Sequence, residues 1–342
     1  MTTGVDHVDA AAAARPPRQR TLLQVLAAVL ALLLADQIGR HLGLGRAVAV
    51  LCLSSLGTLV ICARLGWRQA LLGVAGLAVL AVPAALSSND PLAATLLMTG
   101  TAFGLGLSAR WQLQQVYWLM VVSLCLLITN NPLPLPATAT ELSRLVIALL
   151  GCGGVTVLLQ SRLVPRAADS AGAELFSVAH SWRRSAAYGL LLATTTLITT
   201  PIAMREHWHI SGVWLILTPF LVLRPFVRES WRVAVHRSLG SLAGVLTVVA
   251  LAVALPRQLP LLVPAILLGV TTALVAIRRG HPALVVMALT ATVVLFNSNH
   301  ADLLQMADER IQANALGIAI ALTMMAIAHP IERQLRLRQH SG

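Results

Sequence analysis

The stretch 208–244, WHISGVWLILTPFLVLRPFVRESWRVAVHRSLGSLAG, contains two apolar runs joined by a basic segment. The first run ends at Pro225, and the second begins at Gly240. Five basic side chains stand near the junction: Arg224, Arg228, Arg232, His236 and Arg237. Two apolar runs with a basic connection are typical of two membrane helices joined on one side of a bilayer.

The composition of the whole chain extends this interpretation. Of 342 residues, 57% are hydrophobic and 11% are charged, and the mean hydropathy is +0.79. A soluble domain carries about 25% charged residues, and one membrane span needs roughly 20 apolar residues. The predicted fold is therefore an all-α, polytopic membrane bundle of twelve helices, with spans at 21–38, 46–63, 69–86, 91–109, 112–130, 142–162, 184–203, 208–225, 237–255, 259–277, 282–297 and 310–329.

The sequence indicates that the twelve spans form two copies of a six-helix unit. Arg144 is followed seven residues later by Gly151, and Arg310 is followed seven residues later by Gly317. An even number of spans per copy gives both copies the same orientation, so we expect parallel repeats with a pathway between the halves. The predicted organisation is a disordered basic cytoplasmic tail (1–20), the first repeat (21–163), a cytoplasmic linker (164–183), the second repeat (184–330) and a basic cytoplasmic tail (331–342).

The positive charge is explained by membrane topology. The net charge is +12, but every basic residue other than His is Arg, and the arginines stand between apolar runs. With twelve spans, 19 of the 25 arginines fall on the side of the N-terminus. Positive residues stay on the cytoplasmic side, so we expect a multi-pass protein of the plasma (inner) membrane with both termini cytoplasmic. The lipid bilayer is the predicted partner, nucleic acid is not, and a homo-oligomer is left open.

No pattern of enzymatic or metal-binding residues is present in the sequence. It contains no P-loop, no paired catalytic carboxylates and no Ser/His/Asp pattern on a soluble domain. The four cysteines (Cys52, Cys62, Cys125 and Cys152) lie in or at the edge of apolar runs without the spacing of metal ligands. We therefore predict neither an enzyme nor a cofactor or metal site.

One pattern in the opening stretch is more specific than a pair of spans. Trp214, Thr218, Pro225, Arg237, Gly240 and Gly244 follow the spacing W-x3-T-x6-P-x11-R-x2-G-x3-G, and Arg310, Gly317 and Pro330 follow in the last span. This arrangement resembles the membrane signature and closing helix of the fusaric acid resistance / aromatic acid exporter family. In the first half only the general pattern is present: Thr58 takes the place of Pro225, and no Trp matches Trp214.

The resemblance implies an inner-membrane exporter of small, often aromatic, carboxylic acids that is driven by the proton gradient. Larger family members carry a long cytoplasmic domain where this chain has the linker 164–183. The superfamily also includes plant malate channels, so a passive organic-anion channel is an alternative. A membrane scaffold for envelope assembly, without transport, is the alternative from another class.

Arg144 and Arg310 are candidate substrate-binding residues. They stand at matching positions near the start of the sixth and twelfth spans, and a guanidinium binds a carboxylate through two hydrogen bonds. The alternative is an interfacial ion pair with neighbouring acids, Glu141 for Arg144 and Asp308 or Glu309 for Arg310.

Trp214, Thr218 and Arg237 complete the predicted substrate site. Trp214 and Thr218 are four residues apart, so they share one helix face that can present a ring and a hydroxyl to an aromatic acid. A packed Trp is the alternative. Arg237 stands at the edge of its span, where it can attract anions, whereas Arg224, Arg228 and Arg232 are explained by topology.

Asp36, His207 and His209 are the candidates for proton coupling. Histidine titrates near neutral pH, and Asp36 is an acid at the end of the first apolar run. The alternatives are a polar outer loop for the histidines and a helix end for Asp36. The segment around Asp36 also resembles the D-x-x-G-R motif of major-facilitator transporters, but it follows the first span instead of the second.

Two glycine pairs, Gly240 with Gly244 and Gly100 with Gly104, have small-x3-small spacing. Such pairs let membrane helices approach closely. We therefore predict close helix packing at both.

Overall fold

The computed structural model describes residues 17–111, 113–134, 137–164, 181–205, 209–223, 227–254, 261–278, 280–297 and 303–340. Within these residues every regular element is a helix, which confirms the predicted all-α, polytopic fold class. The α-helices are α2 (Pro17–His41), α3 (Val48–Leu65), α4 (Trp67–Ser87), α5 (Pro91–Leu107), α6 (Gln114–Thr129), α7 (Ala139–Leu163), α9 (Trp182–Arg205), α10 (His209–Val222), α11 (Val227–Ala254), α12 (Leu262–Ile277), α13 (Pro282–Asn297) and α14 (Leu303–His340), with short 3-10 helices η1 (Gly45–Ala47) and η2 (Ser108–Trp111).

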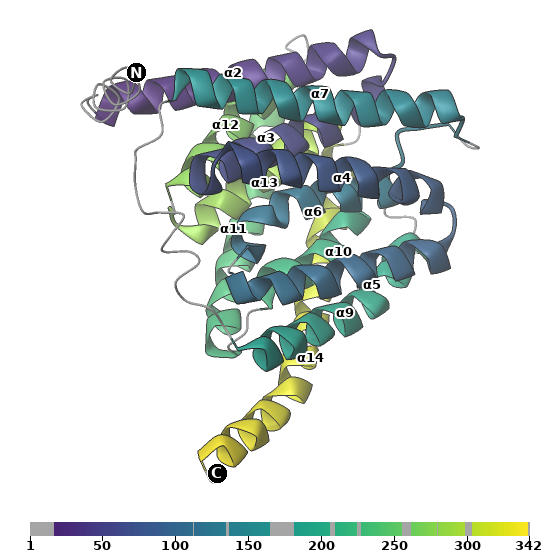
Figure 1. Cartoon of the computed structure of the whole chain (residues 1–342), viewed down its shortest axis with the longest axis vertical. Coiled ribbons are helices and arrows are strands. Elements are labelled where there is room, and N and C mark those ends of the chain that lie inside the picture. Colours follow the sequence, from purple (N-terminus) through teal and green to yellow (C-terminus); the bar gives the residue numbers. More distant parts are fainter. Residues whose placement is uncertain are drawn as a thin grey trace, which may run out of the picture.

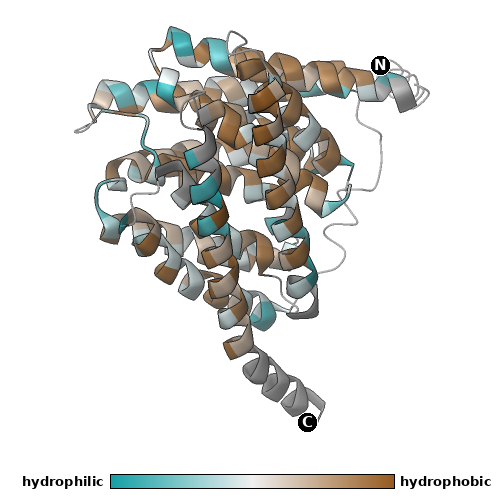
Figure 2. Cartoon of the chain, turned by 180° about the vertical axis from the view of Figure 1, so that it is seen from behind, coloured by the Kyte–Doolittle hydropathy of each residue, from teal (hydrophilic) through white to brown (hydrophobic). Residues whose placement is uncertain are grey.

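Each of the twelve predicted spans corresponds to one α-helix. Eight helices are long and apolar enough to cross a membrane, and α6, α10, α12 and α13 are shorter apolar helices. The last helix differs from the prediction, because α14 runs through Pro330 and reaches His340. Figure 1 shows the C-terminal part of α14 extending beyond the rest of the bundle. Figure 2 shows apolar residues along most of the helices and hydrophilic residues largely at helix ends and connections.

Helices at corresponding places in the two halves make corresponding contacts. α4 packs against α7 as α11 packs against α14, and α3 packs against α7 as α10 packs against α14. One helix of each half also packs against the other half: α5 packs along α9, and α12 packs against α2. These are contacts that two parallel repeats would make, and the repeat and its boundaries stay a prediction.

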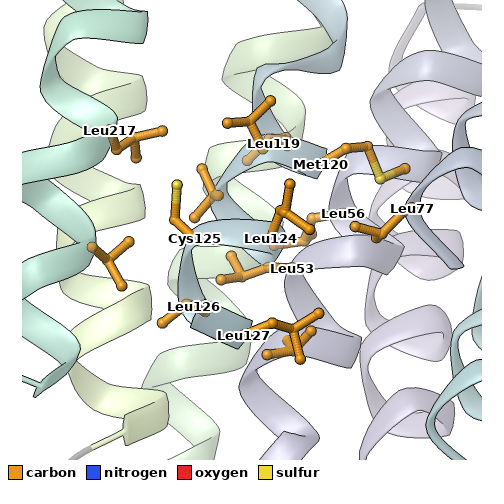
Figure 3. Close-up of a cluster of buried hydrophobic side chains, with 14 of the residues drawn as sticks. Leu53, Leu56, Leu77, Leu119, Met120, Leu124, Cys125, Leu126, Leu127 and Leu217 are labelled. Carbon is orange, nitrogen blue, oxygen red and sulfur yellow. The ribbon is translucent and has the colours of Figure 1, made fainter. Parts of the chain in front are cut away.

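The helices α3 and α10 lie inside the bundle. Nearly all of α3 is buried, and so are the described side chains of α10 from Gly212 to Phe220. The apolar side chains of α3, α4, α6 and α10 meet in one cluster, part of which Figure 3 shows around Leu53, Leu124 and Leu217. Because α10 is interior, Trp214 and Thr218 belong to the core of the protein.

Local sequence explains where two of these helices begin. The Asp90 carboxylate accepts from the backbone N–H groups of Leu92 and Ala93 at the start of α5, and Pro91 takes the first helical position. Thr138 and Glu141 form a capping box at the start of α7.

The prediction of close packing at glycines is confirmed for one pair and wrong for the other. A Cβ on Gly240 or Gly244 would collide with α13, so these glycines let α11 approach it. A Cβ on Gly100 or Gly104 would meet nothing. The close approach of α5 is made instead by Gly106, which lies against Gly189 of α9. The face of α5 that carries Gly106 is therefore turned toward α9, and Gly100 and Gly104 are left uncovered.

Candidate functional site

Three helices of the second half bring polar side chains together inside the bundle. Trp214 and Thr218 come from the interior helix α10, Arg237 from α11, and Arg310 and Asn314 from α14. We call these five residues the arginine cluster. All five are buried: Arg237, Arg310 and Trp214 each have 1% of their surface exposed, and Thr218 and Asn314 are also buried. The spacing along the helices explains the assembly, because residues four apart lie on the same helix face.

Arg237 is held by hydrogen bonds from one of its terminal nitrogens. Its Nη2 donates to Thr218 Oγ1 at 3.0 Å and to Asn314 Oδ1 at 3.2 Å. The Thr218 hydroxyl in turn lies within hydrogen-bonding distance of the Trp214 carbonyl oxygen. Arg237 on α11 is thereby tied to both α10 and α14.

Arg310 lies on the face of the Trp214 indole. Its Cζ atom is 3.4 Å from the ring centroid, and Arg237 Cζ is 5.7 Å from the same centroid. A desolvated cation–π contact contributes about 2 kcal/mol. Trp214 is therefore a packed residue that holds one guanidinium closely and lies near a second. This placement agrees with the alternative of a packed Trp, because Arg310 occupies a face on which an aromatic substrate would stack.

Most of the guanidinium hydrogen-bonding capacity in the cluster is unused. Arg237 Nε and Nη1 and all three nitrogens of Arg310 are buried without a hydrogen-bond partner, and so is Asn314 Nδ2. In the part of the chain that the structure describes, the one ion pair joins Arg40 and Asp36, so neither arginine of the cluster has a carboxylate partner there. Buried charges are costly unless they are paired. Two buried guanidinium groups with free donors therefore form an environment suited to an anion.

A glycine permits the helix contact on which the cluster depends. A Cβ on Gly317 would lie 2.8 Å from Thr218 Cβ and 3.0 Å from its Oγ1, which is closer than real Cβ contacts. Gly317 thus lets α14 approach α10 closely enough for Asn314 and Arg310 to reach Arg237 and Trp214. This gives a physical reason for the Arg310–Gly317 spacing.

Four of the five predicted substrate-binding residues meet in this cluster, and Arg144 does not. The Arg144 side chain is exposed on α7, beside the capping box of Thr138 and Glu141, whereas Arg310 is buried. Matching positions in the two halves therefore have different surroundings. A role for Arg144 in substrate binding stays a prediction.

The candidates for proton coupling lie outside the arginine cluster or outside the described residues. Asp36 is buried and accepts from Arg40 Nε at 2.9 and 3.0 Å. Both line a cavity of about 350 Å³ between α2 and residues of α12 and α13, among them Leu262 and Phe296. His207 lies outside the described residues, and His209 is the first residue of α10 but has no described side chain.

Asn314 is not among the residues predicted from the sequence, although its Oδ1 accepts hydrogen bonds from Arg237 Nη2 and from Thr218 Oγ1. Its signal in the sequence is an amide one helical turn after Arg310, on the same helix face. Pro225 and Arg224, at the break in the opening stretch, lie outside the described residues.

The described helices define the class of the protein. Many apolar helices with a buried polar cluster make it a multi-pass membrane protein. Residues 197–324 match the family model described as fusaric acid resistance protein-like. The match includes every residue of the arginine cluster, and it confirms the resemblance predicted from the sequence. Together, the helices and the match indicate a membrane transporter of the resistance type. No curated protein and no solved structure matches the chain.

Proposed function

We propose that this protein is a secondary transporter of the inner membrane that exports small organic acids, aromatic carboxylic acids among them, at the expense of the proton gradient. The observation that carries the proposal is the pair of buried guanidinium groups, Arg237 and Arg310, with free donors and no carboxylate partner in the described part of the chain. A carboxylate can accept hydrogen bonds from both, and it supplies the negative charge that the cluster lacks.

The two arginines have different surroundings, which supports different roles. Arg237 is fixed by Thr218 and Asn314, and it keeps Nε and Nη1 for a ligand. Among the described residues Arg310 has no hydrogen-bond partner and lies on the Trp214 ring, so all its nitrogens can turn toward a ligand. We assign Arg237 as the fixed anchor for the carboxylate and Arg310 as the group that closes on it.

Transport requires that the anion stabilise one arrangement of the helices more than another. The cluster joins α10, α11 and α14, so an anion between Arg237 and Arg310 would link all three. Without the anion, two positive charges face one Trp ring and repel each other. Binding would therefore favour the closed arrangement, and release would favour separation of α14 from α11.

The orientation and the coupling are part of the same proposal. Arg237 and Arg310 lie buried in the arginine cluster, and 18 of the remaining 23 arginines fall on the side of the N-terminus, which supports cytoplasmic termini. Asp36 is the described acid best placed to carry a proton, because it is buried and lines a cavity. His207 and His209 are the further candidates.

Uptake into inside-out vesicles tests the proposal. Vesicles that contain the full chain receive a pH gradient, acidic inside, and radiolabelled benzoate. We expect benzoate uptake that an uncoupler abolishes and that the Arg237→Gln variant lacks. The Arg232→Gln variant is the matched control, because it removes an exposed arginine of the same helix.

Equal uptake by the Arg237→Gln variant would refute the assigned site. Unitary anion currents in a planar bilayer would favour the channel alternative over the carrier. No transport in either assay, together with altered envelope composition on deletion, would favour the scaffold.

A further inference from the structure

A second site lies on the first half, lined by helices that contribute no residue to the arginine cluster. α4, α5 and α6 enclose a groove of about 680 Å³ that is open on one side. Its walls are almost entirely apolar, and they include Gly76 of α4 with Gly100 and Gly104 of α5. A Cβ on any of these glycines would meet nothing within 4 Å, so the space beside them is empty of protein.

The groove exists because of how α5 packs. α5 lies along α9 of the other half and touches α6 at few positions, whereas its counterpart α12 packs along α13. The space that helix contact fills in the second half is therefore left open in the first. In Figure 1, α4 and α5 lie on either side of α6.

Basic and aromatic side chains flank one end of the groove. Arg68 stands one helical turn before the lining residue Leu72, and Arg110 stands two residues after the lining residue Ser108. Arg68 Cζ is 5.3 Å from the Trp67 ring centroid, and Arg110 Cζ is 5.9 and 5.8 Å from those of Trp111 and Trp182. All three rings are exposed. Exposed Trp rings at helix ends mark the level of the lipid headgroups, and in the described part of the chain no carboxylate pairs with either arginine.

We propose that this groove is a binding site for a phospholipid with an anionic headgroup. The acyl chains lie along Gly76, Gly100 and Gly104, and the phosphate lies between Arg68 and Arg110. An apolar groove inside a membrane span meets lipid tails, and basic residues at the membrane surface attract anionic headgroups. The site goes beyond the proposed transport function and does not depend on it.

The charge at one end of the groove favours a lipid over a helix of a second copy. The groove follows α5 from Leu96 to Ser108, about 18 Å at 1.5 Å per residue. Arg68 and Arg110 flank one end of this length, and no carboxylate of the described residues pairs with them. An anionic headgroup joined to apolar chains supplies the opposite charge at that end and apolar contacts along the rest, which an apolar helix does not.

Native mass spectrometry of the full chain tests the proposal. The protein is released from nanodiscs made of equal parts phosphatidylglycerol and phosphatidylethanolamine. We expect one phosphatidylglycerol to remain bound in preference to phosphatidylethanolamine. The Arg68→Gln/Arg110→Gln variant should lose the preference, and the Arg162→Gln/Arg232→Gln variant, which removes two exposed arginines elsewhere, should keep it.

A steric pair of variants tests the groove itself. The Gly76→Leu/Gly100→Leu variant places side chains in the groove without a clash at Cβ and should lose the bound lipid. The Gly151→Leu/Gly154→Leu variant is the control, because these glycines of α7 also have open space at Cβ and do not line the groove. Retention of phosphatidylglycerol by the groove variant overturns the proposal. So does equal retention of both lipids by the wild type, or a stable dimer that the groove variant abolishes.

Discussion

The substitution Arg310→Gln should make the ligand-free protein more stable and insensitive to benzoate. Arg310 is buried, with no hydrogen bond at any of its three nitrogens and no carboxylate partner in the described residues. The effective cost of a buried unpaired ion is several kcal/mol. The contact that the substitution loses, with the Trp214 ring 3.4 Å away, contributes about 2 kcal/mol.

The cost of the buried, unpaired charge is larger than the contribution of the cation–π contact, so the substitution should stabilise the folded state. Removing the charge also removes its repulsion with Arg237, which shares the Trp214 ring. We expect the free energy of unfolding to rise by about 2 kcal/mol, which raises the melting temperature by a few degrees. A binding residue that weakens the empty protein is an instance of the conflict between stability and function.

In the presence of benzoate the wild type should be more stable than the Arg310→Gln variant, the reverse of the order expected without ligand. A ligand at 100 times its Kd stabilises the folded state by about 2.7 kcal/mol. The wild type should gain this stabilisation, and the Arg310→Gln variant should gain almost none.

The assay is thermal unfolding of the purified protein followed by intrinsic Trp fluorescence, with and without benzoate. The Arg232→Gln variant, which loses an exposed arginine, should behave as the wild type in both conditions. A lower melting temperature of the ligand-free Arg310→Gln variant, combined with an unchanged response to benzoate, would refute the reasoning and leave Arg310 as a structural partner of Trp214.

Three further substitutions probe the cluster and the proton candidate. Asn314→Asp places a carboxylate beside Arg237, so the melting temperature should rise and the benzoate shift should disappear; an unchanged benzoate shift would count against the site. Gly317→Val drives a side chain into Thr218, so the yield of monodisperse protein on size exclusion should collapse, whereas Gly151→Val, with open space at Cβ, should be tolerated. Asp36→Asn loses an ion pair with an exposed arginine, which is worth under about 1 kcal/mol, so stability should change little. If Asp36 carries the proton, uptake driven by a pH gradient should stop in that variant while benzoate exchange without a gradient continues.

The spans were predictable from the sequence because the bilayer allows few solutions. Backbone groups in lipid must bond within the chain, so an apolar run of sufficient length becomes a helix. The interior position of α10 was not predictable, since a helix that is apolar all round can face lipid or protein. Hydropathy fixes where a membrane helix lies along the chain and leaves its rotation to packing.

The glycine pairs also show that the sequence does not determine which face of a helix meets a neighbour. Gly240–Gly244 and Gly100–Gly104 have identical spacing, but only the first pair meets another helix. The difference arises because Gly106 turns another face of α5 toward α9. Glycine spacing identifies a helix face that another helix can approach closely. Whether a helix packs there is decided by the tertiary structure.

Four of the predicted site residues lie together because the sequence pattern combines residues from three helices, and their role in binding stays a prediction. Trp214, Thr218, Arg237 and Arg310 meet as the pattern implied. Arg144 was included because it matches Arg310 in the repeat, but burial differs between the two. The sequence does not single out Asn314, because Gln312 of the same helix carries an equivalent amide, and only the packing of the helix decides that Asn314 is buried and Gln312 exposed.

The arginine cluster has no polar counterpart at the matching positions of the first half. At the offset that relates Gly73 to Gly240, Arg237 corresponds to Ala70. At the offset that relates Arg144 to Arg310, Asn314 corresponds to Ala148. Both alanines are fully buried, so the first half fills the equivalent space with apolar packing.

A pathway on the axis between two equivalent halves would draw residues from both. The arginine cluster draws on α10, α11 and α14 alone, all of which belong to the second half. The expectation of a pathway between the halves therefore needs a different form. The second half would supply the charged site, and the first would supply two apolar neighbours, α6 against α10 and α3 against α13. If the proposed function holds, separation of α11 from α14 is enough to move the two arginines apart and release an anion, because Arg237 belongs to α11 and Arg310 to α14.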